Sequence, residues 1–162
     1  MNPPSDITVT PPGKLTAEDL AQCLAVIKEG DAVNIESATE ELPLAKFVAI
    51  HRVDGKIVAV GAIKRQRGWY AGDVGKKSGV EVATDMHELG YVSVTENQRG
   101  KKLSKRLTAS LLEAFQGKPL FATTSSERMK SALSDAKFEQ CGEPWPGQKG
   151  ELSLWLFKDV ER

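Results

Sequence analysis

The stretch TENQRGKKLSKRL, residues 95–107, decides the fold. It joins a predicted strand over residues 89–94 to a predicted helix whose apolar residues recur every four positions. The first turns of that helix carry the cations Lys101, Lys102, Lys105 and Arg106. The helix dipole is positive at this end, so cations are unfavourable there unless an anion binds the free backbone N–H groups. The pattern therefore predicts a phosphate-binding turn, against the plainer interpretation of a solvated basic helix face.

Strands and helices alternate on either side of this turn. Thr16 and Asp19 are typical of a helix start and Gly30 of a helix end, while Asp54-Gly55 suits a tight hairpin turn. The predicted elements are strands over 7–10, 47–53, 56–64, 89–94, 120–124 and 152–157, and helices over 16–30, 101–115 and 127–136. The connections 34–43 and 65–86 are predicted to be loops. This order predicts an α/β fold, an α+β sandwich with at least one parallel βαβ pair.

The composition limits the classes of protein to consider. The 162 residues fit one domain, 1–162, whose first 13 residues are expected to be partly flexible. Twenty-two basic and 22 acidic residues give zero net charge, so no general field recruits nucleic acid or a membrane surface. A chain of this size needs no metal or disulfide to hold its core. With no long apolar run, no secretory signal and two cysteines, Cys23 and Cys141, the chain is expected in the cytoplasm.

The turn has neither the Walker pattern nor the dinucleotide-binding glycines. Residues 99–104 instead resemble the Arg/Gln-x-x-Gly-x-Gly/Ala turn of the GNAT superfamily of coenzyme A-dependent N-acyltransferases, and the order of elements over 7–157 is similar too. The resemblance implies a mixed, mostly antiparallel central sheet with a splayed parallel strand pair and flanking helices, and acetyl-CoA as cofactor. The cofactor-binding residues it implies are Val92, Val94, Arg99, Gly100, Lys101, Lys102, Leu103, Ser104, Lys105 and Ser126.

Several positions depart from the pattern of the superfamily. Lys102 and Ser104 stand where its turn has glycines, and Lys137 replaces a third glycine. Ser126 stands at the position of a common Asn, and Leu133 at that of the Tyr that protonates the leaving thiolate. Two effects of Lys102 stay open: its side chain neutralises the diphosphate, or its Cβ weakens binding.

The resemblance also implies a catalytic base. Glu88 lies 11 residues before Arg99 (99 − 88 = 11), the spacing of that base in several members, and His87 is the alternative base. Strand alternation places Glu88, Val92 and Val94 on one face and Tyr91 on the other. By that alternation Tyr91 is excluded as the acid, which leaves Tyr70 as the substitute for the missing Tyr.

The acceptor site carries fewer signals. Trp69 and Tyr70, at the start of the long connection, are candidates for a wall of the substrate site. The acidic residues Glu36, Glu40 and Glu41 are candidates to face a cationic amine. A small-molecule or peptide amine is therefore the expected acceptor, with no metal site and no membrane partner, and a homodimer is left open.

Three functions compete at this point. The first is an N-acetyltransferase that moves an acetyl group from acetyl-CoA to an amine by direct attack in a ternary complex. The second is a catalytically weak or inactive relative that binds coenzyme A or a protein partner, as Lys102 and Leu133 suggest. The third is a nucleic-acid binder that uses residues 98–106, which zero net charge and 6% aromatic residues disfavour.

Overall fold

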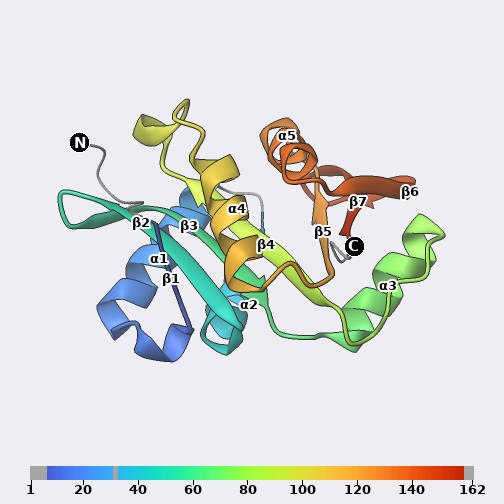
Figure 1. Cartoon of the computed structure of the whole chain (residues 1–162), viewed down its shortest axis with the longest axis horizontal. Coiled ribbons are helices and arrows are strands. Elements are labelled where there is room, and N and C mark those ends of the chain that lie inside the picture. The colour runs from blue at the N-terminus through green and yellow to red at the C-terminus, as the bar shows by residue number, and fades with distance from the viewer. Residues whose placement is uncertain (1–6, 31–32, 159–162) are drawn as a thin grey trace.

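A computed structural model describes residues 7–30 and 33–158, and within them seven strands form one mixed sheet (Figure 1). The strand order is β1-β2-β3-β4-β5-β7-β6, with β4 and β5 parallel and the other neighbours antiparallel. The strands are β1 (Ile7–Thr10), β2 (Phe47–Val53), β3 (Lys56–Lys64), β4 (His87–Val94), β5 (Leu120–Thr124), β6 (Glu139–Gly147) and β7 (Gly150–Phe157). The expected mixed, mostly antiparallel sheet with one parallel pair is confirmed.

Helices cover both faces of the sheet (Figure 1). They are α1 (Ala17–Gly30), α2 (Ile35–Glu41), α3 (Gly68–Ser78), α4 (Leu103–Ala114) and α5 (Glu127–Asp135), with short 3₁₀ helices at Pro12–Lys14, Leu42–Leu44 and Glu96–Gln98. Leu107 and Leu111 of α4 lie in the core on one face, and Val26 and Ile27 of α1 lie in the core on the other. Among residues 7–30 and 33–158, no helix has the length and apolar character needed to cross a bilayer.

The local signals read from the sequence are confirmed in detail. Thr16 Oγ1 accepts the Asp19 N–H at 3.0 Å and Asp19 Oδ2 accepts the Thr16 N–H at 3.3 Å, a reciprocal cap on α1. In the hairpin turn Asp54 and Gly55 have φ values of 53° and 80°, the positive pair that a type I′ turn requires. For the expected flexibility of residues 1–13, positions 1–6 lie outside the described residues, while 7–13 contain β1 and the start of the first 3₁₀ helix.

Each of the two predicted loops contains a helix. Residues 34–43 contain α2, which Asn34 caps by accepting the Ser37 N–H at 3.0 Å. Residues 65–86 contain α3, whose glycines are poor helix formers and concealed it. At Gly75 a Cβ would lie 2.9 Å from the Val80 carbonyl oxygen, so close packing accounts for a glycine inside this helix.

The strand β6 has no counterpart in the sequence prediction. Its segment EQCGEPWPG contains two prolines and two glycines, which normally argue against a strand. The strand lies at the edge of the sheet, where a proline without an N–H is tolerated. Edge position therefore explains both the strand and the failure to predict it.

A β-bulge interrupts β4 at Tyr91. Gly90 pairs with Ala62 and Ser93 pairs with Val60, so two residues of β4 lie opposite one residue of β3. Tyr91 has a φ of 59°, in the left-handed region. The bulge shifts the alternation of side chains from this point to the end of the strand.

The face assignment made from simple alternation was therefore wrong. The Lys64 ammonium lies 3.3 Å from Glu88 Oε2 and 4.1 Å from the centre of the Tyr91 ring, so Glu88 and Tyr91 share one side of β4. Val92 and Val94 instead pack with the core beneath α4. The bulge brings a tyrosine hydroxyl to the side that carries the glutamate.

Candidate functional site

A cleft opens where β4 and β5 separate. The two strands pair in parallel through His87 with Leu120 and Glu88 with Phe121, and beyond these pairs they diverge (Figure 1). The cleft has a volume of about 520 Å³ and is lined by residues 89–94 of β4 and 122–126 at the end of β5. The splayed parallel pair therefore exposes one backbone edge of β4 to a ligand.

A second cavity, of about 240 Å³, adjoins the cleft at the start of α4. Val94, Arg99, Ser104 and Arg128 line both cavities, so the two lie side by side. The cations that line the smaller cavity are Arg99, Lys102, Lys105 and Arg128. The cluster at the α4 N-terminus and the cleft between the strands thus belong together.

The turn before α4 exposes its backbone amides through two left-handed residues. Gly100 has a φ of 87°, and Lys102, the N-cap residue, has a φ of 60°. The Arg99 Nε donates to the Val94 carbonyl at 3.1 Å, which fixes the guanidinium at the junction of the two cavities. The first turn of α4, residues 103–106, contains no acidic residue. Free N–H groups and fixed cations therefore act on the same point, as anion binding requires.

Lys101 and Lys105 of the turn each contact another side chain of the protein. Lys101 donates to Gln98 Oε1 at 2.9 Å and lines neither cavity. Lys105 lies 2.7 Å from Asp135, and this contact holds the pKa of that carboxyl below its ordinary value. Arg99 and Lys102 are left as the turn residues best placed to meet an anion.

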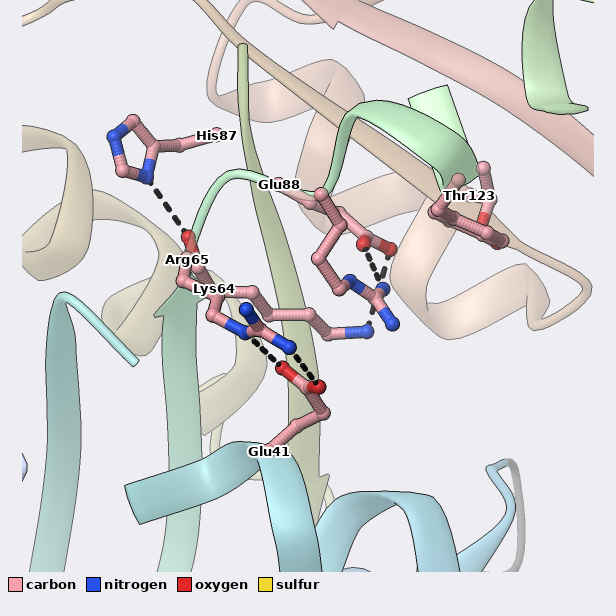
Figure 2. Close-up of polar contacts among 8 residues, drawn as sticks. Glu41, Lys64, Arg65, His87, Glu88 and Thr123 are labelled. Carbon is pink, nitrogen blue, oxygen red and sulfur yellow. Dashed lines mark hydrogen bonds and ion pairs between the residues drawn. The ribbon is translucent and has the colours of Figure 1, made fainter. Parts of the chain in front are cut away.

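The base of the cleft holds a buried cluster of charge (Figure 2). Glu88 Oε2 accepts from the Lys64 ammonium at 3.3 Å, and Glu88 Oε1 accepts from the Arg67 guanidinium at 2.7 Å. The side chains of Lys64, Arg67 and Glu88 are 10%, 8% and 5% exposed. Burial lowers the pKa of Lys64 below its ordinary 10.5. Both oxygens of Glu88 are thus engaged by cations.

Both tyrosines of the chain line this cleft. Burial raises the pKa of Tyr70 and of Tyr91 from 10.0 to about 12, so both are protonated at neutral pH. The Tyr70 hydroxyl lies 3.1 Å from Thr123 Oγ1 on β5, which directs it across the cleft. Each can donate a hydrogen bond to a substrate.

The remaining predicted residues lie in different surroundings. Trp69 is 69% exposed at the cleft rim, and Ser126 lines the cleft while its Oγ caps α5 by accepting the Met129 N–H at 3.2 Å. His87 Nδ1 lies 2.9 Å from the Lys64 carbonyl oxygen and its ring packs against Phe115, turned away from Glu88 (Figure 2). The structure therefore does not bring His87 to the cleft. Among the described residues, no group of three or more His, Cys, Asp or Glu side chains could hold a metal ion.

The acidic residues of α2 do not form an open anionic wall. Glu41 accepts two hydrogen bonds from Arg65, at 2.9 and 2.8 Å (Figure 2). These bonds hold the pKa of Glu41 below its ordinary value. Glu36 and Glu40 are exposed, and neither lines the cleft.

Comparison with solved structures identifies the architecture. A GNAT-family acetyltransferase from Streptococcus agalactiae is similar, with a TM-score of 0.69 at 14% identity over 98% of each chain. An acyl-CoA N-acyltransferase from Pseudomonas aeruginosa gives 0.66 at 14% identity over 93% of this chain and 97% of that one. A ribosomal-protein-alanine N-acetyltransferase from Brucella melitensis gives 0.62 at 19% identity over 92% and 98%. The chain has the GNAT fold. No protein-family model and no curated protein matches the sequence.

Two lysines, Lys102 and Lys137, stand at positions where the GNAT resemblance predicts glycine. Lys102 has a φ of 60° and Lys137 a φ of 77°, so both adopt the left-handed backbone that a glycine would supply. Both lysines therefore stand where the backbone conformation favours glycine. At the position of the usual Tyr, Leu133 is fully buried in the core and offers no proton.

The sequence did not lead to Lys64 and Arg67, the two basic residues that contact Glu88 at the base of the cleft. Lys64 ends the strand KIVAVGAIK, where a charge among apolar residues was a usable signal. Arg67 lies in the segment predicted as a loop, and Arg128 on the first turn of α5, and neither position stands out in the sequence. Tyr91 was excluded because a bulge cannot be seen in strand alternation.

Proposed function

We propose that this chain is an N-acetyltransferase that transfers an acetyl group from acetyl-CoA to an amine. One observation carries the proposal: the cleft between β4 and β5 adjoins the cationic cavity at the α4 N-terminus, and four residues line both. A long ligand with a diphosphate at one end and a thioester at the other fits such a site. The GNAT fold of the chain supports this choice among the ligands of that shape.

The residues of the turn suit the diphosphate of coenzyme A. The amides around Gly100 and Lys102, with the side chains of Arg99 and Ser104, would hold it. The free edge of β4 at Val92 and Val94 would pair with the amide groups of the pantetheine arm. When bound, acetyl-CoA supplies the activated acyl group.

Residues at the base of the cleft would accept and donate the protons of the reaction. Glu88 is our candidate to take the amine proton through water, although Lys64 and Arg67 already bind both of its oxygens. The neutral amine is the form that attacks the thioester, so we expect turnover to rise with pH as the amine itself loses its proton. Tyr70 and Tyr91, both protonated at neutral pH, are the candidate donors to the leaving thiolate.

A calorimetric titration with acetyl-CoA tests the binding half of the proposal. We expect micromolar affinity, and Ser104→Asp should abolish it because a carboxylate would face the diphosphate. Ala109→Asp, on the exposed side of the same helix, is the matched control and should bind as the wild type does. Absence of binding up to millimolar acetyl-CoA would overturn the proposal.

A second candidate function is binding of coenzyme A without turnover. Leu133 at the usual Tyr position and the engaged oxygens of Glu88 favour it. Free thiol release, measured with a panel of primary amines, separates the two functions. Thiol release that depends on an amine supports the transferase, whereas tight binding with no release for any amine supports the binding module.

A further inference from the structure

The Nε–H group of Arg67 has no role in the proposed acetyl transfer. Its side chain is 8% exposed and lines the cleft, and its Nη2 donates to Glu88. Its Nε is buried and has no hydrogen-bond partner within the part of the chain that the structure describes. A guanidinium has five N–H donors, and buried donors in proteins are nearly always paired. A ligand with acceptor oxygens would satisfy this group.

Arg65, two positions earlier, is an arginine of the same chain whose Nε donor is hydrogen-bonded. Its Nε and Nη2 each donate to one oxygen of Glu41, at 2.9 and 2.8 Å, in a two-pronged contact. Arg67 uses Nη2 alone, and its guanidinium lies over the rings of Tyr70 at 4.7 Å and Trp69 at 5.3 Å. The edge of Arg67 that carries Nε is therefore suited to a carboxylate.

The charged residues at the base of the cleft also favour a carboxylate ligand. Lys64 and Arg67 share one carboxylate, Glu88, so two basic side chains and a single acidic one are buried together. The neighbouring acids are committed elsewhere, because Glu41 binds Arg65 and Asp73 lies 3.2 Å from Lys77. A buried charge is costly unless it is paired, so a ligand anion is favourable here.

We propose that Arg67, together with Lys64, binds the carboxylate of the substrate at the base of the cleft. The proposal deepens the proposed acetyl transfer and rests on it for the view that the cleft holds donor and acceptor. Two molecules could bring this carboxylate. One is an acceptor with an amine and a carboxylate, such as a free amino acid, and the other is an acyl donor whose acyl chain ends in a carboxylate.

Two calorimetric comparisons separate these sources. In the acceptor comparison each standard L-amino acid is titrated beside its α-amide, with and without coenzyme A. In the donor comparison succinyl-CoA is titrated beside acetyl-CoA. We expect at least one pair to show binding about tenfold tighter for the member that carries the carboxylate, the difference that one charge-assisted contact gives.

Three variants test whether Arg67 causes the preference for the member of each pair that carries the carboxylate. Arg67→Met should abolish it, and Arg67→Lys should retain a small part of it, because a lysine keeps the charge but not the planar fork. Arg65→Met is the matched control, since that arginine points to Glu41 and does not line the cleft. It should keep the full preference.

The outcomes distinguish this proposal from the proposed function. If acetyl-CoA does not bind while an amino acid outcompetes its amide, the acetyl transfer fails and the carboxylate site stands. If acetyl-CoA binds but no carboxylate-bearing member of any pair binds more tightly, the carboxylate site is wrong. A preference that persists in Arg67→Met also overturns it. Should Arg67→Met not fold, Arg67→Lys and the wild-type comparison still decide.

Discussion

The two ends of the cleft are both positively charged, but they hold their charge in opposite ways. At the turn, Lys102 is exposed and the Lys105 side chain is 38% exposed, and the backbone offers N–H groups through two left-handed residues. At the base, Lys64, Arg67 and Glu88 are nearly sealed from water and bind one another. Exposed charge is screened by salt and can be removed at little cost, whereas buried charge is tied to the stability of the fold.

The largest effect expected from this contrast is on the stability of Glu88→Gln. The substitution leaves Lys64 and Arg67 buried without a carboxylate, so we expect a loss of about 3 kcal/mol in the free energy of unfolding. Urea denaturation measures it. Glu41→Gln is the control, because its partner Arg65 is 47% exposed, and it should lose less than about 1 kcal/mol. Equal losses in the free energy of unfolding of the two variants would contradict the burial of the charged residues at the base of the cleft.

The second prediction concerns pH and uses the two tyrosines as probes. Their folded-state pKa values of about 12 lie above 10.0, so the unfolded chain loses these protons first. The stability they contribute is complete below pH 10 and is lost as the pH rises from 10 towards 12. Absorbance near 295 nm should show no tyrosinate at pH 10 in the folded protein. The chain in guanidinium, where both residues titrate near 10, is the control, and a folded titration near 10 would mean that the base is open to water.

The third prediction concerns the exposed end. Arg99→Ala should weaken acetyl-CoA binding about tenfold, since it removes a donor where the two cavities meet. Binding by the wild type should also weaken as salt is raised. Lys101→Ala is the control, because Lys101 contacts Gln98 and lines neither cavity, and it should change affinity little. Equal losses in the two variants would mean that general positive charge, and not the placement of Arg99, attracts the ligand.

The sequence was sufficient where the signals are local and insufficient where they depend on packing. Thr16 with Asp19 and Asp54 with Gly55 determine their own turns, and both were predicted. The turn at 99–104 was found because cations at a helix start contradict the helix dipole. The bulge at Tyr91 depends on pairing with β3, and no pattern within the strand encodes it.

The base of the cleft was harder to predict for a related reason. Its charged residues come from β3, the segment before α3, and β4, which only the folded sheet brings together. Glu88 was found through a resemblance in spacing, but that spacing says nothing about its partners. Lys64, a charge at the end of an apolar strand, was a usable signal that was not followed, and Arg67 became visible through its contacts alone. The sequence therefore supplied the candidate base without its surroundings.

The smallest effect expected separates the two roles left open for Lys102. Its φ of 60° is unfavourable for any residue with a Cβ, so Lys102→Gly should be more stable than Lys102→Ala by about 1 kcal/mol. The two variants lose the same charge and differ by the Cβ alone. If the side chain helps to neutralise the diphosphate, both should bind acetyl-CoA a few-fold more weakly than the wild type and equally so. We expect this result, because Lys102 lines the cavity and the left-handed backbone already provides the turn that glycine would give. Tighter binding by Lys102→Gly than by the wild type would show instead that the Cβ obstructs the phosphate, and that the exposed end of the cleft is limited by shape more than by charge.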